Sequence, residues 1–137
     1  MIDFTSKDRY DFADLQRLVE ALRAPGGCPW DAAQTHLSIR RNFLEEAYEA
    51  CEALDCDDAA MLREELGDVL FAAVRVASTL ERDPEQALHA ACEKFIRRFT
   101  AMEQTALAEG RPLETLSKDE LLAGWNAQKR VVPGGEQ

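Results

Sequence analysis

Few of the residues and motifs that mark common binding sites occur in this sequence. Its four cysteines show no CxxC spacing, and it has only two histidines. Reduced thiols in a cytoplasmic protein are therefore a better interpretation than disulfides or a zinc site. Neither a Walker A loop nor a Gly-x-Gly-x-x-Gly motif is present, which excludes the glycine-rich loops that bind phosphates in many proteins.

Long apolar runs and an excess of positive charge are also lacking. The longest apolar run, residues 69–74, ends at Arg75 and is too short to cross a membrane. Residues 1–10 carry several charges and no apolar segment, so we expect no signal peptide. The net charge of -10 disfavours a DNA or RNA duplex as partner, because such a partner requires a basic surface. A single nucleotide, held by a metal ion and a few local cations, is not excluded.

The spacing of apolar residues predicts an all-α fold, because no stretch alternates as a strand does. Asp31 with Gln34 predicts a capping box, and Asp83 followed by a proline predicts another helix start. The expected helices span roughly residues 8–23, 31–54, 59–81, 84–108 and 118–130. The length predicts a single domain over residues 8–130, followed by a flexible tail over residues 131–137.

Two acidic clusters lie on neighbouring predicted helices. Each contains two carboxylates at i, i+3, which share one helix face, and a short turn makes the helices antiparallel neighbours. On a helical wheel, one pair on each helix lies roughly 80° to 140° from the apolar stripe, whereas Glu45 and Glu64 point away from it. The four nominated carboxylates are Glu46, Glu49, Glu65 and Asp68.

These carboxylates have two interpretations. They could be solvated acids that pair with Arg41 or Arg63, as on many helix surfaces. They could instead converge on a divalent cation, and the lack of lysines interleaved at i+4 favours this second interpretation. An all-carboxylate site suits Mg²⁺ or Mn²⁺, whereas a di-iron site needs Glu-x-x-His motifs and an EF-hand needs a glycine that the acidic turn lacks.

A basic cluster and two tryptophans could contact a nucleotide. Lys94, Arg97 and Arg98 lie at helical spacing and could meet a polyphosphate, although they could equally form a solvated face. Trp30 and Trp125 lie near predicted helix ends, where an indole stacks on a base or plugs the end of a bundle.

Five ordered motifs resemble one family of enzymes. They are Gly26-Gly27-Cys28-Pro29-Trp30-Asp31, Gln34-Thr35-His36, Leu44-Glu45-Glu46-Ala47-Tyr48-Glu49, Leu62-Arg63-Glu64-Glu65-Leu66-Gly67-Asp68 and Glu93-Lys94-Phe95-Ile96-Arg97-Arg98-Phe99. Over roughly residues 10–130, the chain resembles the MazG-type nucleoside triphosphate pyrophosphohydrolases. The resemblance implies an all-α MazG-like bundle whose four-helix core is completed by dimerisation, in a homodimer or homotetramer. It also implies Mg²⁺-dependent hydrolysis of (d)NTP to (d)NMP and pyrophosphate, in nucleotide-pool house-cleaning.

The resemblance also implies roles for individual residues. Family metal ligands fall on the four nominated carboxylates, and family nucleotide contacts fall on Asn42 to Glu46, Lys94 to Arg98, Trp125 and Lys129. We expect Trp30 to contribute to substrate binding, and Glu45 is our candidate general base. The residues expected to act in catalysis are Glu45, Glu46, Glu65 and Lys94.

Two departures from the family pattern keep other functions open. Cys92 stands where the family often has asparagine, and the chain has one domain where many relatives have two in tandem. A dimeric helical module that binds metal or nucleotide without turnover is the main alternative. A purely structural bundle is a third.

Overall fold

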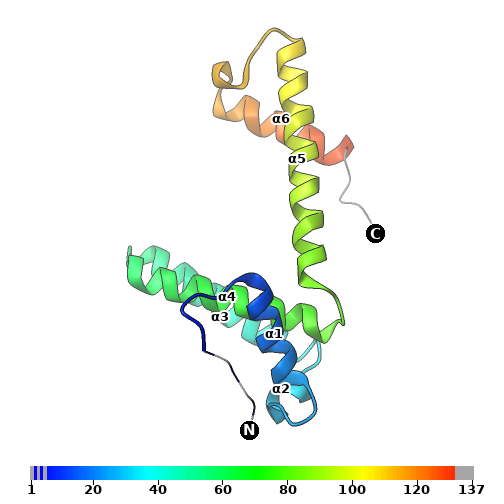
Figure 1. Cartoon of the computed structure of the whole chain (residues 1–137). Helices are drawn as coiled ribbons and strands as arrows, with labels where there is room; N and C mark the ends of the chain where they lie inside the picture. The colour runs from blue at the N-terminus through cyan, green and yellow to red at the C-terminus, as the bar shows by residue number, and fades with distance from the viewer. Residues whose placement is uncertain (1, 3, 5, 132–137) are drawn as a thin grey trace. The chain divides into compact units, whose positions relative to one another are not determined.

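The computed structural model describes residues 2, 4 and 6–131, and its regular elements are all helical. The helices are α1 (Phe12–Arg23), α2 (Pro29–Ala33), α3 (Arg40–Asp55), α4 (Ala59–Thr79), α5 (Pro84–Ala108) and α6 (Lys118–Val131), with a 3₁₀ turn at Leu113–Thr115. The predicted all-α class is confirmed (Figure 1). Val131 belongs to α6, and the rest of the predicted tail, residues 132–137, lies outside the described residues.

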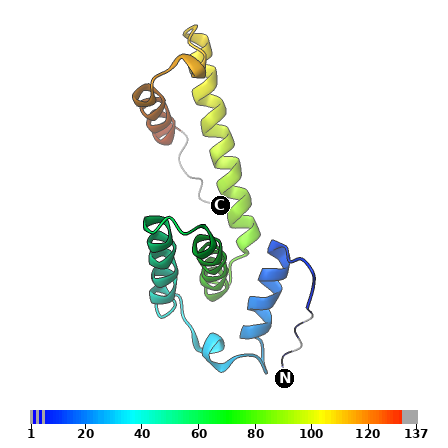
Figure 2. The same cartoon turned by 90° about the vertical axis from the view of Figure 1, so that its left-hand side faces the viewer.

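The chain divides into two compact units, residues 1–84 and 85–137. In the first unit, α3 and α4 run side by side, joined by the short turn at residues 56–58, and α1 contacts both α2 and α4 (Figures 1 and 2). The core of this unit includes the buried side chains Val19, Ile39, Ala53, Ala72 and Val74. A single domain over residues 8–130 stays a prediction.

The first helix begins at Phe12 instead of the predicted Asp8, because Asp11 and Asp14 form its capping box. Asp14 is only 7% exposed, and one of its oxygens lies 2.5 Å from both Lys7 Nζ and Arg17 Nη2. The hydrogen bond from Lys7, followed by those from the Asp11 backbone and Arg17, lowers the pKa of Asp14 well below its usual range. The Asp14 carboxylate thus binds the segment before α1 to the helix through its ion pair with Lys7.

The predicted helix over residues 31–54 is wrong, because the chain makes two helices there, α2 and α3. Pro29 begins the short α2, and Gln34 ends it in an extended conformation. Between the two helices, Thr35 and Ser38 exchange hydrogen bonds from each backbone N–H to the other side-chain oxygen, at 2.9 and 3.2 Å. This reciprocal pair has the pattern of a capping box and gives the chain a local alternative to a continuous helix.

The apolar stripes that periodicity predicts for α3 and α4 are only partly buried within this chain. The side chains that these helices bury are small: Ala50, Ala53, Ala72 and Val74. Larger members of the two stripes stay exposed: Phe43, Leu44, Leu54, Leu66 and Leu70. Small residues let the two helix backbones approach closely, so the large side chains lie outside the contact. Within the first unit, the faces that carry them are left uncovered.

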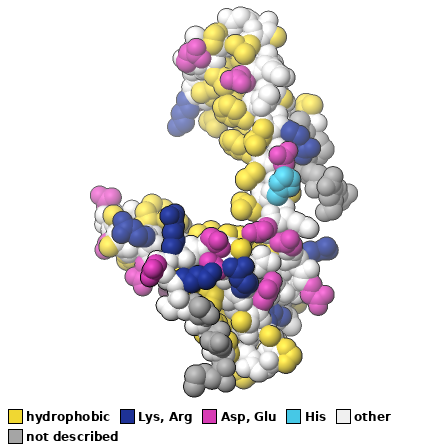
Figure 3. Space-filling view, viewed as in Figure 1, with side chains coloured by type: hydrophobic (Ala, Val, Ile, Leu, Met, Phe, Trp, Pro, Cys, Tyr) yellow, Lys and Arg dark blue, Asp and Glu magenta, His cyan; other side chains and the backbone are white. Residues whose placement is uncertain are grey.

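The second unit consists of α5, the 3₁₀ turn and α6. Met102 and Ala106 of α5 are buried, and Gly124 of α6 lies against Met102. The predicted capping box at the start of α6 is confirmed, since Glu120 accepts a 2.8 Å hydrogen bond from the Ser117 backbone and Ser117 Oγ accepts one from the Glu120 backbone. Hydrophobic side chains lie along the visible face of this unit (Figure 3). Within the described residues, no helix is both long and apolar enough to span a membrane.

Candidate metal centre

Packing of α3 against α4 brings three carboxylates together. Glu46, Glu49 and Glu65 each offer one oxygen, and these oxygens all lie within 4.8 Å of one another. Glu46 and Glu65 are half-buried and Glu49 is exposed, as expected for side chains on the shoulders of two packed helices. Asp68, the fourth carboxylate of the sequence-based prediction, is not in this group of three but is close enough to affect the electrostatics of Glu65.

The pKa of Glu65 shows how crowded the site is. Burial raises this pKa above its usual value, and the negative charges of Glu49, Asp68, Glu64 and Glu46 raise it further. Both effects disfavour the ionised form of Glu65. A cation placed among these oxygens would reverse the balance, because it would favour the ionised carboxylates.

Asn42 supports one member of the group. Its Nδ2 donates a 2.8 Å hydrogen bond to Oε1 of Glu46, one turn further along α3. Its Oδ1 is buried and has no hydrogen-bond partner among the described residues. Buried amide oxygens are normally paired, often with ordered water, so this atom can accept a hydrogen bond from a group such as metal-bound water.

The residues present fit a hard divalent cation. The group offers only carboxylate oxygens, which are preferred by Mg²⁺ and Mn²⁺ and are a poor match to the nitrogen and sulfur ligands that zinc takes. Three converging carboxylates also leave coordination positions for water or for oxygens of a phosphate.

Other residues predicted for the site lie elsewhere on the chain. Glu45 is not part of the group, and it accepts a 2.9 Å hydrogen bond from Arg41 Nε in an ion pair. Trp30 lies on α2 and is 51% exposed. The remaining predicted contacts lie on α5 and α6 in the second unit: Lys94, Arg97, Arg98, Trp125 and Lys129. Within that unit the Trp125 ring packs on Phe95, with 5.3 Å between centroids.

Two residues beside Trp30 were missed by the sequence-based prediction. Asp31 is buried, and its carboxylate lies 3.1 Å from Nε of Arg75 on α4. Arg23 of α1 donates a 2.6 Å hydrogen bond to the backbone oxygen of Asp31. Local spacing predicts a helix cap at Asp31, and only a contact between distant parts of the chain shows that it forms an ion pair instead.

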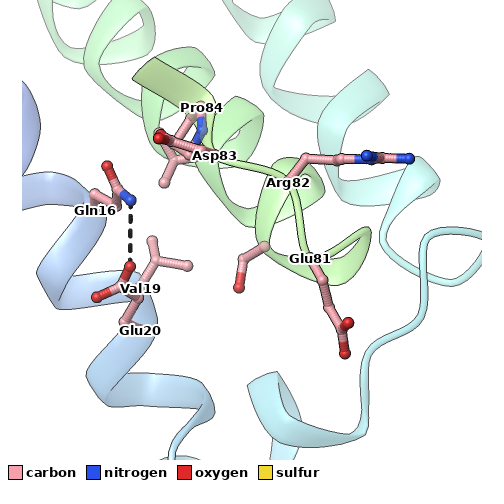
Figure 4. Close-up of a pocket in the computed structure, with 9 residues that line it drawn as sticks. Gln16, Val19, Glu20, Glu81, Arg82, Asp83 and Pro84 are labelled. Atoms are coloured by element: carbon pink, nitrogen blue, oxygen red, sulfur yellow. Dashed lines mark hydrogen bonds between the residues drawn. The ribbon is translucent and has the colours of Figure 1, made fainter. Parts of the chain in front are cut away.

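A cavity of about 380 Å³ lies in the first unit, away from the acidic group. It is lined by residues of α1, by the C-terminal part of α4 and by the segment that follows α4. Figure 4 shows Gln16 hydrogen-bonded to Glu20 on one wall, at 3.2 Å, and Arg82 extending away from α1. None of the four nominated carboxylates lines this cavity.

The fold and the acidic group together define an all-α protein with a candidate metal site between two packed helices. Residues 34–102 match the MazG nucleotide pyrophosphohydrolase domain, and the chain belongs to this family. The match includes the whole of α3 and α4, and therefore the four nominated carboxylates.

Several curated proteins are similar to this chain. The nucleoside triphosphate pyrophosphohydrolase/pyrophosphatase MazG of Thermotoga maritima is 43% identical over 64% of this chain and 36% of its own length. A nucleoside triphosphate pyrophosphohydrolase of Mycolicibacterium smegmatis is 36% identical over 85% of this chain and 35% of its own length. An uncharacterized protein of Bacillus subtilis, YabN, is 30% identical over 89% of this chain and 24% of its own length. The chain thus spans well under half the length of these relatives.

Proposed function

We propose that this chain hydrolyses nucleoside triphosphates to nucleoside monophosphates and pyrophosphate in a Mg²⁺-dependent reaction. The observation that carries the proposal is the convergence of Glu46, Glu49 and Glu65 in a member of the MazG family. Two relatives named as nucleoside triphosphate pyrophosphohydrolases support the substrate class and the reaction. Removal of unwanted nucleotides from the cellular pool is the role we assign to this activity.

In this proposal the acidic group holds the metal ion. Glu46, Glu49 and Glu65 provide oxygen ligands, and Asp68, one turn beyond Glu65 on α4, completes the set. Asn42 orients Glu46 through its 2.8 Å hydrogen bond. When bound, the ion polarises phosphate oxygens, acidifies a coordinated water and neutralises developing negative charge.

The protein's own groups position the reactants. A water oxygen attacks the α-phosphorus, the bond from that phosphorus to the bridging oxygen breaks, and pyrophosphate leaves. Glu45 is our candidate to accept the proton of the water once a partner subunit covers it, which also requires its release from Arg41. Lys94, Arg97 and Arg98 of α5 neutralise the leaving pyrophosphate.

Recognition of the nucleoside uses the aromatic residues and nearby polar groups. Trp30 offers an exposed indole on which a base can stack. Trp125 and Lys129 of α6, together with Asn42 of α3, are the other proposed contacts. We further propose that two or more copies of the chain assemble to complete the bundle, because large apolar side chains of α3 and α4 remain exposed.

Product analysis tests this function. The purified protein is incubated with a panel of NTPs and dNTPs, with Mg²⁺ or with excess chelator, and products are resolved by phosphorus NMR. We expect monophosphate and pyrophosphate from at least one substrate, and only with metal. Release of orthophosphate and diphosphate instead would contradict the proposed bond cleavage. Nucleotide binding without turnover would favour the non-catalytic alternative, which the exposed Cys92 of α5 keeps open.

A further inference from the structure

Arg75 of α4 occupies an unusual position for a cation in an acidic chain. Its guanidinium carbon lies 4.7 Å from the ring centroid of Phe71 and 5.5 Å from that of Trp30, and its Nε lies 3.1 Å from Asp31. The arginine side chain is 24% exposed and the partner carboxylate 7% exposed. Two aromatic rings and a buried carboxylate therefore restrain the guanidinium, whose buried Nε has the ion pair with Asp31 but no hydrogen bond among the described residues.

This arrangement determines where the Trp30 ring lies. The α2 helix has five residues and no side-chain cap at its start, so it has little stability of its own. Arg23 binds the backbone of α2 to α1, with hydrogen bonds to the Asp31 and Gln34 carbonyl oxygens. Among the contacts described for α2, those from Arg75 are the ones that join its side chains to α4.

Arg75 lies on the helix that also carries part of the acidic site. It follows Asp68 by seven residues, so these two side chains share one side of α4, about 10 Å apart along the axis. Glu65, the α4 member of the acidic group, lies about 15 Å before Arg75 along the same axis. A nucleotide whose α-phosphate lies at the carboxylates can reach this distance with its base. Arg75 covers part of the indole, and Trp30 is still 51% exposed, so indole surface remains open to a second ligand.

We propose that Arg75 is a positioning residue that fixes Trp30 as the wall of the base subsite. The inference rests on the proposed function, because it takes Trp30 to be the residue against which the base stacks. Arg75 itself touches no substrate in this proposal. It acts by holding the indole, with Asp31 and Phe71 holding the guanidinium in turn.

Arg75→Met tests the inference, since methionine keeps an unbranched apolar stem and removes the charge and the planar fork. We expect KM to rise about tenfold for each nucleoside triphosphate that the wild type hydrolyses. A tenfold loss of affinity lies within the free energy that stacking of one base typically contributes. The value of kcat should change little, because stacking on the base is present before and during the reaction. The inhibition constant of inorganic tripolyphosphate, which has no base, should stay unchanged. Arg63→Met, an exposed arginine of the same helix, is the matched control.

A second readout does not depend on activity. In a Trp125→Phe background Trp30 is the only tryptophan, and its fluorescence reports on its surroundings. Arg75→Met should increase quenching of Trp30 by acrylamide in the ligand-free protein, with Arg75→Lys between methionine and wild type. Unchanged quenching would overturn the proposal that Arg75 positions Trp30.

The kinetic outcomes separate the two proposals. Increased quenching with unchanged KM would show that Trp30 does not contact the base. A loss of tripolyphosphate binding equal to the rise in KM would show that Arg75 has a merely structural role. Either result would overturn the inference. A wild-type protein that hydrolyses no nucleotide would instead overturn the proposed function, while the quenching experiment would still test the contact of Arg75 with Trp30.

Discussion

At the scale of single residues, Glu65 shows a conflict between stability and the proposed function. Its folded-state pKa is raised, by burial first and then by four neighbouring carboxylates. The folded protein therefore binds this proton more tightly than the unfolded chain does. Between the unfolded and folded pKa values, stability falls as pH rises, and the full penalty is present above the folded pKa. A penalty of this sign is expected where carboxylates are gathered for a metal ion.

Glu65→Gln should remove this penalty, since glutamine keeps the shape of the side chain and has no charge. In metal-free buffer near pH 7 we expect the variant to have a higher Tm than the wild type, with the difference shrinking toward about pH 4 as Glu65 is protonated. Differential scanning calorimetry across this range measures the effect. Glu64→Gln, at an exposed neighbouring position, should change Tm less. A wild type more stable than Glu65→Gln near neutral pH would refute the raised pKa.

Asn42 allows a second prediction at this scale. Asn42→Ala removes the 2.8 Å hydrogen bond to Glu46 without touching the carboxylates themselves. We expect the Kd for Mg²⁺ to rise about tenfold, the low end of the range for residues that orient a metal ligand. Isothermal titration calorimetry with Mg²⁺ measures it, and Asn126→Ala on α6 is the matched control. An unchanged Kd would mean that Glu46 needs no support from Asn42.

At the scale of helices, backbone geometry at the end of α1 gives a sharp prediction. A Cβ on Gly27 would lie 2.4 Å from the backbone oxygens of both Ala21 and Leu22, so any side chain there must displace the chain. Gly26 has a φ of +84° but open space around it. Substitutions at these adjacent glycines therefore distinguish the effect of a steric clash, at Gly27, from that of backbone strain, at Gly26.

Gly27→Ala should destabilise the protein by about 3 kcal/mol, the upper end of typical single substitutions. Gly26→Ala should cost only about 1 kcal/mol, the usual penalty for a left-handed residue with a Cβ. Urea denaturation followed by circular dichroism gives both values. Equal losses in the free energy of unfolding at the two positions would show that the close approach at Gly27 is not present in solution.

Local signals in the sequence predict much of the helix arrangement. The starts of α5 and α6 follow from Asp83 before a proline and from the box of Ser117 with Glu120, because a cap involves only neighbouring residues. The break before α3 was missed because the Thr35 and Ser38 pair competes with the apolar periodicity. Periodicity reports which face is apolar, not whether anything covers it.

The acidic group shows the same division between local and long-range information. Spacing nominates its carboxylates, since i, i+3 pairs on two adjacent helices follow from the sequence alone, and the structure brings three of the four together. Contacts between distant residues carry no such signal. The ion pair of Asp31 with Arg75 joins positions far apart in the chain, and no local pattern indicates it.

At the scale of the whole molecule, exposed apolar side chains predict self-association. Leu66 and Leu70 of α4 are 51% and 54% exposed, and Phe95 and Ile96 of α5 are both 54% exposed. Apolar residues grouped along helices in this way commonly mark a protein interface. We expect light scattering after size exclusion to give at least twice the 15.3 kDa of one chain.

Leu70→Asp should shift this assembly toward the monomer while helix content by circular dichroism is retained, because the side chain is exposed within one chain. The charge would be buried only where a second copy covers it. Val74→Asp, at a buried position of the same helix, should instead reduce helix content. A wild-type protein that is monomeric at every concentration would contradict this prediction.

The central claim is that the carboxylates between α3 and α4 hold the metal ion used in nucleotide hydrolysis. The most direct test is the rate of pyrophosphate release, at saturating Mg²⁺, by wild type, Glu65→Gln and Glu64→Gln. We predict that Glu65→Gln loses about a hundredfold or more in rate, as expected when electrostatic stabilisation of the transition state is removed. Glu64→Gln, whose side chain is exposed, should stay within about threefold of wild type. Full activity in Glu65→Gln would contradict the claim.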